Sequence, residues 1–201
     1  MTGPDAPSRA SQPIGRVDHT PPNRPSRGPS EPPTLHGDRV TLRPLTIDDA
    51  PALLGLLTDP GVSAWWQRAS WDQINEEGAV VFALEVDGAV AGSIQFCEET
   101  DPDYHFASID IFVGDAWQGR GVGSEAMRLL IDYLIQERGH HRITVDPAVA
   151  NARAIHVYEQ LGFRPVGTMR AYERVKDGTW RDALLMELIV EPSGGEGAQS
   201  R

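Results

Sequence analysis

Three glycines at alternate positions follow an apolar segment of the sequence. The apolar segment is Ile109-Asp110-Ile111-Phe112-Val113, and the glycines lie in Trp117-Gln118-Gly119-Arg120-Gly121-Val122-Gly123. Helical periodicity begins directly after them, at Ser124. A glycine-rich turn between a strand and a helix directs backbone N–H groups outward beside the positive end of the helix dipole. The pattern predicts a binding site for a diphosphate; the plainer alternative is that the glycines only form a turn.

The residues around these glycines disfavour two common nucleotide-binding loops. A P-loop requires Lys and then Ser or Thr after its last glycine, whereas Ser124-Glu125 follow Gly123 here. The stretch from Gly121 to Ala126 satisfies a loose dinucleotide pattern, but a Rossmann domain places that loop after its first strand. Here three or four predicted strands precede the loop, which disfavours a nicotinamide or flavin dinucleotide.

Asp110 is the candidate general base. Side chains alternate between the two faces of a strand, so Asp110 points away from Ile109 and Ile111 and shares a face with Phe112. A carboxylate on the sheet face where a substrate would lie can accept a proton from it, directly or through water. The alternative is structural, with Asp110 paired to an arginine or capping a loop.

Acidic residues gather shortly before Asp110 in the sequence. They are Glu98, Glu99, Asp101 and Asp103. Such a group could attract a polyamine and raise the pKa of Asp110. It could equally form a solvated loop, as charge runs usually do.

The elements that position these residues alternate between the periodicities of strands and helices. The Asp87-Gly88 pair predicts a hairpin between two apolar runs, and Gly139 and Gly162 predict helix ends. Expected strands are Val40 to Arg43, Ala79 to Leu84, Ala89 to Phe96, Ala107 to Val113, Arg142 to Val145, Phe163 to Met169 and Leu184 to Val190, and expected helices begin at Thr46, Ser124 and Asn151. This order predicts a mixed α/β (α+β) fold with a mostly antiparallel central sheet flanked by helices.

The composition narrows the classes of partner. The 201 residues include 18 Lys and Arg against 29 Asp and Glu, a formal net charge of −11. This balance argues against a nucleic-acid partner and favours a cationic one. No apolar run approaches the roughly 18 to 20 residues of a spanning helix, and no signal peptide begins the chain, so we expect no membrane association and a cytoplasmic location. The single cysteine, Cys97, lies in an apolar stretch, which favours a packing role.

Proline content divides the chain. Residues 1–34 hold nine prolines and few apolar residues, which predicts a disordered N-terminal tail. We expect one folded domain over residues 35–191 and a flexible C-terminal tail over 192–201.

The order of motifs resembles the GCN5-related N-acetyltransferase (GNAT) superfamily. The resemblance covers about residues 36 to 190. Its motifs are Gln118-x-x-Gly121-x-Gly123 and the stretch from Asn151 to Gly162-Phe163. It implies acetyl-CoA as the acetyl donor, with the diphosphate on the glycine loop, and strands that separate just after the predicted base. The implied donor-binding residues are Ile111, Phe112, Val113, Gln118, Gly119, Arg120, Gly121, Val122, Gly123, Ser124, Asn151 and Ala154.

The same resemblance gives two residues of the last predicted helix a role. Tyr158 matches the tyrosine that donates a proton to the departing coenzyme A sulfur, and Asn151 matches a pantetheine contact. Their structural alternatives are a half-buried core tyrosine and a helix N-cap. Backbone N–H groups between Ile111 and Val113 would bind the oxyanion.

A narrower resemblance concerns the acetyl acceptor. Trp65-Trp66, the stretch from Glu98 to Pro102, and Asp146-Pro147 look like those of aminoglycoside 6′-N-acetyltransferases. It implies Asp110 as base and direct attack by an amine. The implied substrate-binding residues are Trp66, Glu99, Asp101, Asp110 and Asp146, and Trp65, Trp66 and Trp71 could form an apolar floor for sugar rings or pack in the core.

Two alternatives remain open at this point. The segments Gly167 to Arg170 and Gly178 to Asp182 are typical of acetyltransferases that act on protein N-termini or small amines such as amino acids and polyamines. A non-catalytic acyl-CoA-binding module is the alternative from another class. We expect no metal site, because the six histidines lack partners at ligand spacing, and a monomer or a homodimer.

Overall fold

The computed structural model of the protein describes residues 32–66, 70–75 and 78–190. The chain divides into two units, Met1–Ser30 and Glu31–Arg201, and the described residues belong to the second. The predicted disordered tails, 1–34 and 192–201, lie outside the described residues apart from 32–34.

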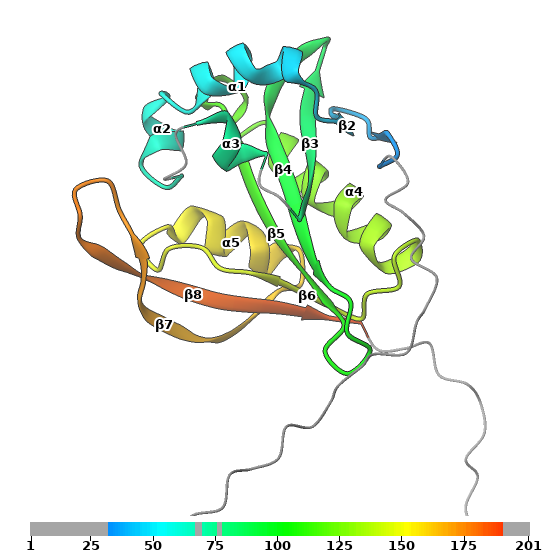
Figure 1. Cartoon of the computed structure of the whole chain (residues 1–201), viewed down its shortest axis with the longest axis vertical. Coiled ribbons are helices and arrows are strands. Elements are labelled where there is room, and N and C mark those ends of the chain that lie inside the picture. Colours follow the sequence, from blue (N-terminus) through cyan, green and yellow to red (C-terminus); the bar gives the residue numbers. More distant parts are fainter. Residues whose placement is uncertain (1–31, 67–69, 76–77, 191–201) are drawn as a thin grey trace, which may run out of the picture. The chain divides into compact units, whose positions relative to one another are not determined.

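Within the described residues, eight strands form one sheet in the order β1-β2-β3-β4-β5-β6-β8-β7. Only β5 and β6 are parallel neighbours; the other pairs are antiparallel. The bounds are Leu35–His36 (β1), Thr41–Pro44 (β2), Ala79–Val86 (β3), Ala89–Glu99 (β4), Phe106–Val113 (β5), Arg142–Val145 (β6), Arg164–Arg174 (β7) and Trp180–Ile189 (β8). The predicted fold class, a mixed and mostly antiparallel sheet with flanking helices, is confirmed (Figure 1).

The described helices are short except for two. They are η1 (Ile47–Asp49), α1 (Ala50–Leu56), α2 (Pro60–Ser63), α3 (Trp71–Ile74), η2 (Asp115–Trp117), α4 (Val122–Gln136) and α5 (Ala152–Gln160). None of the helices in the described ranges has the length and apolar character needed to cross a membrane.

Two buried clusters hold the sheet between helices. Alternate residues of β3 separate them: Phe82 belongs to the cluster that includes α4 and α5, and Val81 to the cluster that includes α1, α2 and α3. Helix α4 contributes Met127 and Leu130 to the first cluster, on the stripe predicted from its periodicity. Both faces of the sheet are therefore covered, as a mixed α/β fold requires.

The turn between β3 and β4 is the predicted hairpin. Asp87 has φ 50° and Gly88 has φ 79°, and two positive φ values are what a two-residue hairpin turn of this kind demands. The prediction of an Asp-Gly hairpin is confirmed.

The sheet opens between β5 and β6. These strands pair only at Ala107 with Ile143 and at Ser108 with Thr144, whereas β5 continues to Val113. In the described part of the chain no strand therefore pairs with this edge of β5 from Ile109 onward. The strands therefore separate before Asp110, earlier than the resemblance implies, and the separation places main-chain polar groups of β5 beside an opening.

Candidate active site

The glycine loop connects β5 to α4 and is held by Gln118. Its side-chain Nε2 donates hydrogen bonds to the carbonyl oxygen of Val113 at 2.8 Å and to Oδ1 of Asp115 at 3.1 Å. Gly119 and Gly121 have φ of 76° and 84°, conformations that a residue with a Cβ rarely adopts. Gly121 is the N-cap of α4, so the loop ends where unpaired helix N–H groups can meet an anion.

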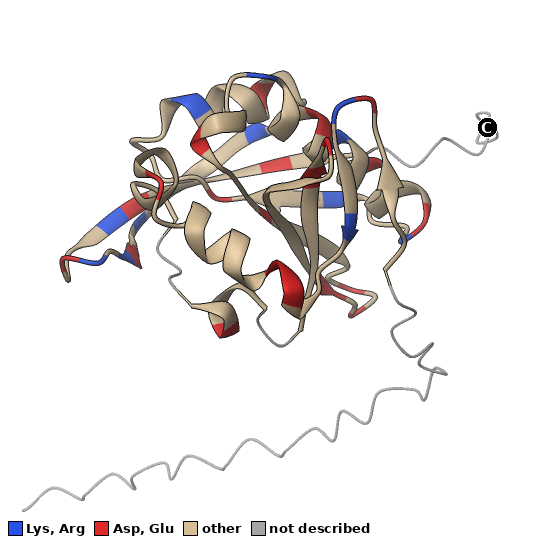
Figure 2. Ribbon diagram, turned by 90° about the horizontal axis from the view of Figure 1, so that it is seen from above, with Lys and Arg blue, Asp and Glu red and all other residues tan. Residues whose placement is uncertain are grey.

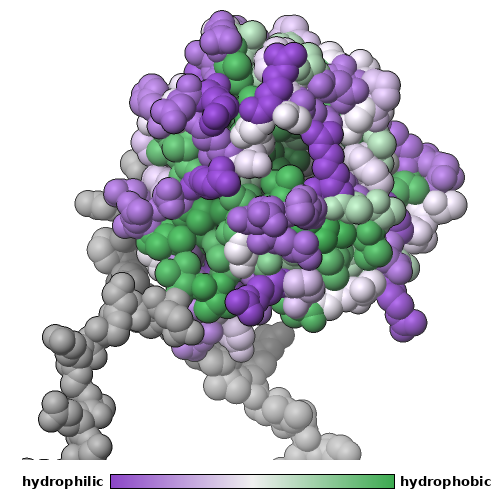
Figure 3. All heavy atoms as spheres, turned by 180° about the vertical axis from the view of Figure 1, so that it is seen from behind, coloured by the Kyte–Doolittle hydropathy of each residue, from purple (hydrophilic) through white to green (hydrophobic). Residues whose placement is uncertain are grey.

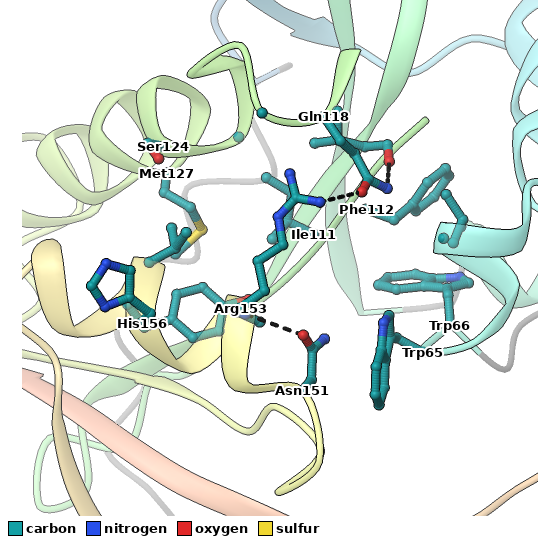
Figure 4. Close-up of a pocket in the computed structure, with 18 of the residues that line it drawn as sticks. Trp65, Trp66, Ile111, Phe112, Gln118, Ser124, Met127, Asn151, Arg153 and His156 are labelled. Carbon is teal, nitrogen blue, oxygen red and sulfur yellow. Dashed lines mark hydrogen bonds between the residues drawn. The ribbon is translucent and has the colours of Figure 1, made fainter. Parts of the chain in front are cut away.

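A cavity of about 790 Å³ lies between this loop, β5, α2 and α5 (Figure 4). We call it the large cavity. Among the residues with predicted donor-binding roles, it is lined by Ile111, Phe112, Val113, Gln118, Gly119, Gly121, Gly123, Ser124, Asn151 and Ala154. The structure thus brings together most of the residues that the sequence assigned to one ligand.

Arg153 extends across the large cavity from the first turn of α5 (Figure 4). Its Nη1 donates to Oε1 of Gln118 at 2.8 Å. A guanidinium beside the glycine loop adds positive charge where a diphosphate would bind. Arg153 was not among the predicted site residues, although it lies within the motif that begins at Asn151.

Helix α5 supplies the tyrosine. Asn151 caps the helix, since its Oδ1 accepts a hydrogen bond from the backbone N–H of Ala154 at 3.1 Å. Tyr158 is 9% exposed and packs against Phe163, with ring centroids 5.8 Å apart. Burial and the nearby carboxylates of Asp110 and Asp146 raise the pKa of Tyr158, so its phenol keeps its proton at neutral pH.

A second cavity, of about 330 Å³, adjoins the first. We call it the acidic cavity because Asp110, Asp146 and Glu173 line it. The residues that line both cavities are Trp65, Trp66, Ile111, Asn151, Ala154 and Tyr158. The two cavities therefore meet beside Tyr158 and the open edge of β5.

Asp146 has an unusual environment. Burial, reinforced by the negative charges of Asp110 and Glu173, raises its pKa from 3.8 to about 6, against a hydrogen bond from Tyr172 that lowers it. The pKa of Tyr172 rises in turn to about 12, chiefly because of the Asp146 charge. A carboxylate with its pKa near neutrality and other carboxylates beside it is typical of a functional site.

Asp110 is in contact with the neighbouring strand. Gln95 lies opposite Asp110 in the β4–β5 ladder, and its Nε2 donates to Oδ2 of Asp110 at 3.3 Å. Gln95 is only 3% exposed. The predicted base therefore points into the acidic cavity with a buried amide at its back.

Four residues with predicted roles lie outside the lining of both cavities. Arg120 is exposed in the loop, and the side chain of Val122 is buried in the core. Glu99 and Asp101 lie at the β4–β5 turn, where Glu99 pairs with Phe106 and accepts a hydrogen bond from the backbone N–H of Asp101 at 2.9 Å. Their contacts with donor or substrate stay predictions.

Two neighbours of that turn also differ from their sequence interpretation. Glu98 accepts hydrogen bonds from Arg138 and lies 2.7 Å from Nε2 of His140, so it links elements of the fold. Cys97 is exposed, contrary to the packing role expected from its apolar neighbours, because its side chain alternates away from that of Phe96 in the core.

Three residues of the C-terminal hairpin line the acidic cavity and were not predicted. They are Tyr172, Glu173 and Arg181. Trp65 and Trp66 line it from the other side, and Trp66 packs on Phe112 with ring centroids 5.0 Å apart. Trp71 packs against the second buried cluster. No group of three His, Cys, Asp or Glu side chains in the described ranges is arranged to hold a metal ion.

Comparison with known proteins agrees with this geometry. The model of the Acetyltransferase (GNAT) family matches residues 50–163. Spermidine N(1)-acetyltransferase of Escherichia coli (strain K12) is 26% identical, over 77% of this chain and 87% of its own. Aminoglycoside N(6′)-acetyltransferase type 1 of Klebsiella pneumoniae is 29% identical, over 68% of this chain and 79% of its own.

A solved structure provides a further comparison. Mycobacterium smegmatis RimJ, in complex with CoA-disulfide, is 26% identical and has a TM-score of 0.67, covering 75% of this chain and 81% of its own. The family model spans more than half of the sequence and contains the glycine loop, Asp110 and Tyr158. The chain belongs to the GNAT family of acetyltransferases, enzymes that use acetyl-CoA as the acetyl donor.

Proposed function

We propose that the protein transfers the acetyl group of acetyl-CoA to an amino group of an aminoglycoside, with the 6′-amine as the favoured position. The observation that carries the proposal is the meeting of the large cavity and the acidic cavity at Tyr158. One cavity has the loop and the volume for an anionic nucleotide, and the other has the carboxylates for an amine.

The donor would bind along the large cavity. Main-chain N–H groups between Gln118 and Ser124 would hold the diphosphate, with Arg153 beside them. The pantetheine arm would run between Asn151 and the open edge of β5. The thioester carbonyl would then meet backbone N–H groups of Ile111 to Val113, which can stabilise the oxyanion.

The acceptor would bind in the acidic cavity as an ammonium ion held by Asp110 and Asp146. Asp110 takes one proton from the nitrogen, directly or through water, and the freed lone pair attacks the thioester carbon. As the tetrahedral intermediate collapses, the C–N bond is kept and the C–S bond breaks. Tyr158 protonates the departing thiolate, and the second proton of the nitrogen passes, directly or through water, to the Tyr158 oxygen, so that one proton remains on Asp110 and is released to solvent.

Tyr158 lines both cavities and carries a hydroxyl group that can meet the thiolate. Its raised pKa keeps the phenol protonated, so it can donate a hydrogen bond as negative charge forms on sulfur and pass on its proton as the bond breaks. The lining of the two cavities does not include Cys97, the chain's single cysteine. Direct attack is therefore favoured over an acyl-enzyme.

A polyamine is the second candidate acceptor. The similarity to a spermidine acetyltransferase supports it, and so does the acidic cavity, whose volume of about 330 Å³ suits a thin aliphatic amine. Protein N-termini and amino acids are the other acceptors in this alternative class.

The test is release of free thiol from acetyl-CoA against a panel of amines. Neomycin B and paromomycin form a matched pair, because they differ only in a 6′-amino group against a 6′-hydroxyl. We expect rapid release with neomycin B and much slower release with paromomycin. Release with spermidine or peptides alone would transfer the assignment to the alternative acceptors. Acetyl-CoA binding without release for any amine would support a non-catalytic module.

A further inference from the structure

Arg181 lies in the acidic cavity, although the proposed reaction gives it no role. It belongs to the segment Gly178 to Asp182, whose sequence is typical of acetyltransferases that act on protein N-termini or small amines. In the structure this segment begins β8, and the β7–β8 hairpin projects from the sheet on the side of α2 (Figure 1). The side chain of Arg181 is 19% exposed.

The guanidinium of Arg181 contacts two separate parts of the chain. On its own hairpin, Nε donates to Oε2 of Glu173 at 2.7 Å. Across the cavity, Nη1 donates to the carbonyl oxygen of Ala64 at 3.1 Å, and Nη2 donates to that of Trp65. The same guanidinium lies 6.0 Å from the centre of the Trp65 ring. One side chain thus joins the hairpin to the end of α2.

The carbonyl groups that Arg181 binds are those of Ala64 and Trp65, at the start of the tryptophan pair, Trp65 and Trp66. Both tryptophans line both cavities. They follow α2, a helix of only four residues, which by itself gives little rigidity. The hydrogen bonds from Arg181 therefore fix the backbone from which these two rings extend.

Arg181 also sets the charge of the cavity. Glu173 is one of the groups that raise the pKa of Asp146, and the ion pair with Arg181 offsets that negative charge. The other charged or titratable groups that face Asp146 are Asp110 on β5, Tyr172 on β7 and Tyr158 on α5. With Glu173 in an ion pair with Arg181, an acceptor meets less negative charge in the acidic cavity.

Asp182, the residue after Arg181, stabilises a bulge in the neighbouring strand β7. Register pairs join Met169 to Ala183 and Glu173 to Arg181, so residues 170–172 of β7 oppose Asp182 alone. Ala171 in this bulge has φ 47°, and its backbone N–H donates to Oδ1 of Asp182 at 2.8 Å. Bulges re-aim side chains, and this one contains Tyr172 and precedes Glu173, both of which line the acidic cavity.

We propose that Arg181 is a positioning and specificity residue for the acetyl acceptor: it holds the tryptophan pair in place and neutralises Glu173. The proposal rests on the proposed function, because it presumes that an amine binds in the acidic cavity. A guanidinium suits this role since its planar fork serves several acceptors at once, which a lysine ammonium cannot do in the same geometry.

The kinetic test compares Arg181→Met and Arg181→Lys with Arg174→Met. Arg174 is an exposed arginine of the same hairpin and lines neither cavity, so its replacement controls for general effects on the hairpin. We expect kcat/KM for the acceptor to fall about tenfold or more in Arg181→Met, because small misplacements of positioning groups have effects up to about a hundredfold. The dissociation constant of acetyl-CoA should change by less than about threefold, and Arg174→Met should resemble the wild type.

The charge test needs no substrate. Titration of the Asp146 carboxyl by carbon-13 NMR should show a pKa higher by roughly half a unit in Arg181→Met, because Glu173 then carries an unbalanced charge. Arg181→Lys should restore this pKa but not the acceptor KM. Adding Glu173→Gln to Arg181→Met should bring the Asp146 pKa back to the wild-type value or below it.

The outcomes separate the two proposals. If the wild type acetylates no amine, the proposed function fails, while the NMR titration still reports on Arg181. If the wild type acetylates amines but Arg181→Met matches Arg174→Met in acceptor KM and in the Asp146 pKa, the role of Arg181 is refuted. A loss of activity that comes with global unfolding in circular dichroism is resolved by Arg181→Lys, whose unchanged acceptor KM would also refute the role.

Discussion

Asp110 and Asp146 share one cavity but have different surroundings. Asp110 accepts a hydrogen bond from the buried amide of Gln95, whereas burial and neighbouring carboxylates raise the pKa of Asp146 to about 6. Environments that differ in this way let two carboxylates take different parts in one reaction. We assign proton removal to Asp110 and acceptor binding to both.

Replacement of Asp110 by asparagine should affect turnover and spare the donor. We expect Asp110→Asn to lower kcat by roughly a hundredfold or more, as loss of a general base typically does. Steady-state thiol release measures kcat, and calorimetry should show nearly unchanged acetyl-CoA affinity. Wild-type turnover in this variant would remove Asp110 from the mechanism.

The ionised carboxylate of Asp146 should lower the free energy of unfolding at neutral pH. The reason is that this carboxyl is harder to ionise in the folded protein than in the unfolded chain. Its folded pKa is raised from 3.8 to about 6, so the folded state binds the extra proton between these values and stability falls as the pH rises through them. We expect Asp146→Asn to increase the free energy of unfolding at pH 7.5 by roughly 1–3 kcal/mol.

The control for this prediction is the same comparison at acidic pH. Urea denaturation of both proteins should give nearly equal free energies of unfolding at pH 4, where the aspartic acid is largely protonated and resembles the amide. A gain of the same size at pH 4 and pH 7.5 would show that ionisation of Asp146 is not its cause.

Among the elements, the loop before α4 makes the most specific demand on the backbone. Gly121 has φ 84°, and the nearest atoms to an added Cβ would belong to Arg39, 3.9 Å away. A substitution there is strained by its backbone conformation and not by crowding. A substitution in this loop therefore tests both acetyl-CoA binding and the stability of the fold.

The matched pair for this loop is Gly121→Ala and Gly88→Ala. Gly88 has φ 79°, and nothing lies within 4 Å of its added Cβ, so both variants should lose roughly 1–2 kcal/mol of stability from backbone strain. Only Gly121→Ala should raise the dissociation constant of acetyl-CoA, by about tenfold. Equal donor affinity in the two variants, measured by calorimetry, would contradict the assignment of the loop.

The sequence predicted those elements whose signals are local. The Asp87-Gly88 turn, the stripe of α4 and the Asn151 cap all depend on residues within a few positions of each other, and the structure has each of them. Most of the predicted donor-binding residues that line the large cavity lie in two short motifs.

The acceptor side depends on contacts between distant segments, and there the sequence was less informative. Helices α2 and α3 have four residues each, too short for a periodicity to emerge. Strand β7 continues past its predicted end to Arg174, and β8 begins before its predicted start, at Trp180. The positive φ of the bulge belongs to Ala171, so no glycine in the sequence predicts it. Arg181 meets Trp65 across 116 residues, a distance over which no local pattern acts.

For the whole molecule, charge is the dominant feature. The formal net charge is −11, and Figure 2 shows acidic and basic residues interspersed over the described ribbon, including the projecting hairpin. A protein with this balance attracts a polycation and repels an anion. We therefore expect acetyl-CoA binding to depend on the hydrogen-bond donors of the glycine loop and on Arg153.

Salt concentration should affect the kinetics of the acceptor and of acetyl-CoA differently. We expect kcat/KM for a polycationic acceptor to fall about tenfold between roughly 20 and 500 mM NaCl, since screening weakens long-range attraction. The KM of acetyl-CoA should rise less or fall. An acceptor kcat/KM that is insensitive to salt would indicate that the carboxylates do not attract the substrate.

The surface opposite the view of Figure 1 carries hydrophobic residues at its centre and hydrophilic residues around them (Figure 3). Clustered exposed apolar residues are common at protein interfaces. The oligomeric state, predicted as a monomer or a homodimer, can be measured by light scattering after size-exclusion chromatography.

The most direct test is a crystal structure of the protein with coenzyme A. The diphosphate should accept hydrogen bonds from main-chain N–H groups between Gln118 and Ser124, and the sulfur should lie within reach of the Tyr158 hydroxyl at the junction of the two cavities. Coenzyme A bound elsewhere, or with its sulfur directed away from Tyr158 and Asp110, would contradict the site and the reaction derived from it.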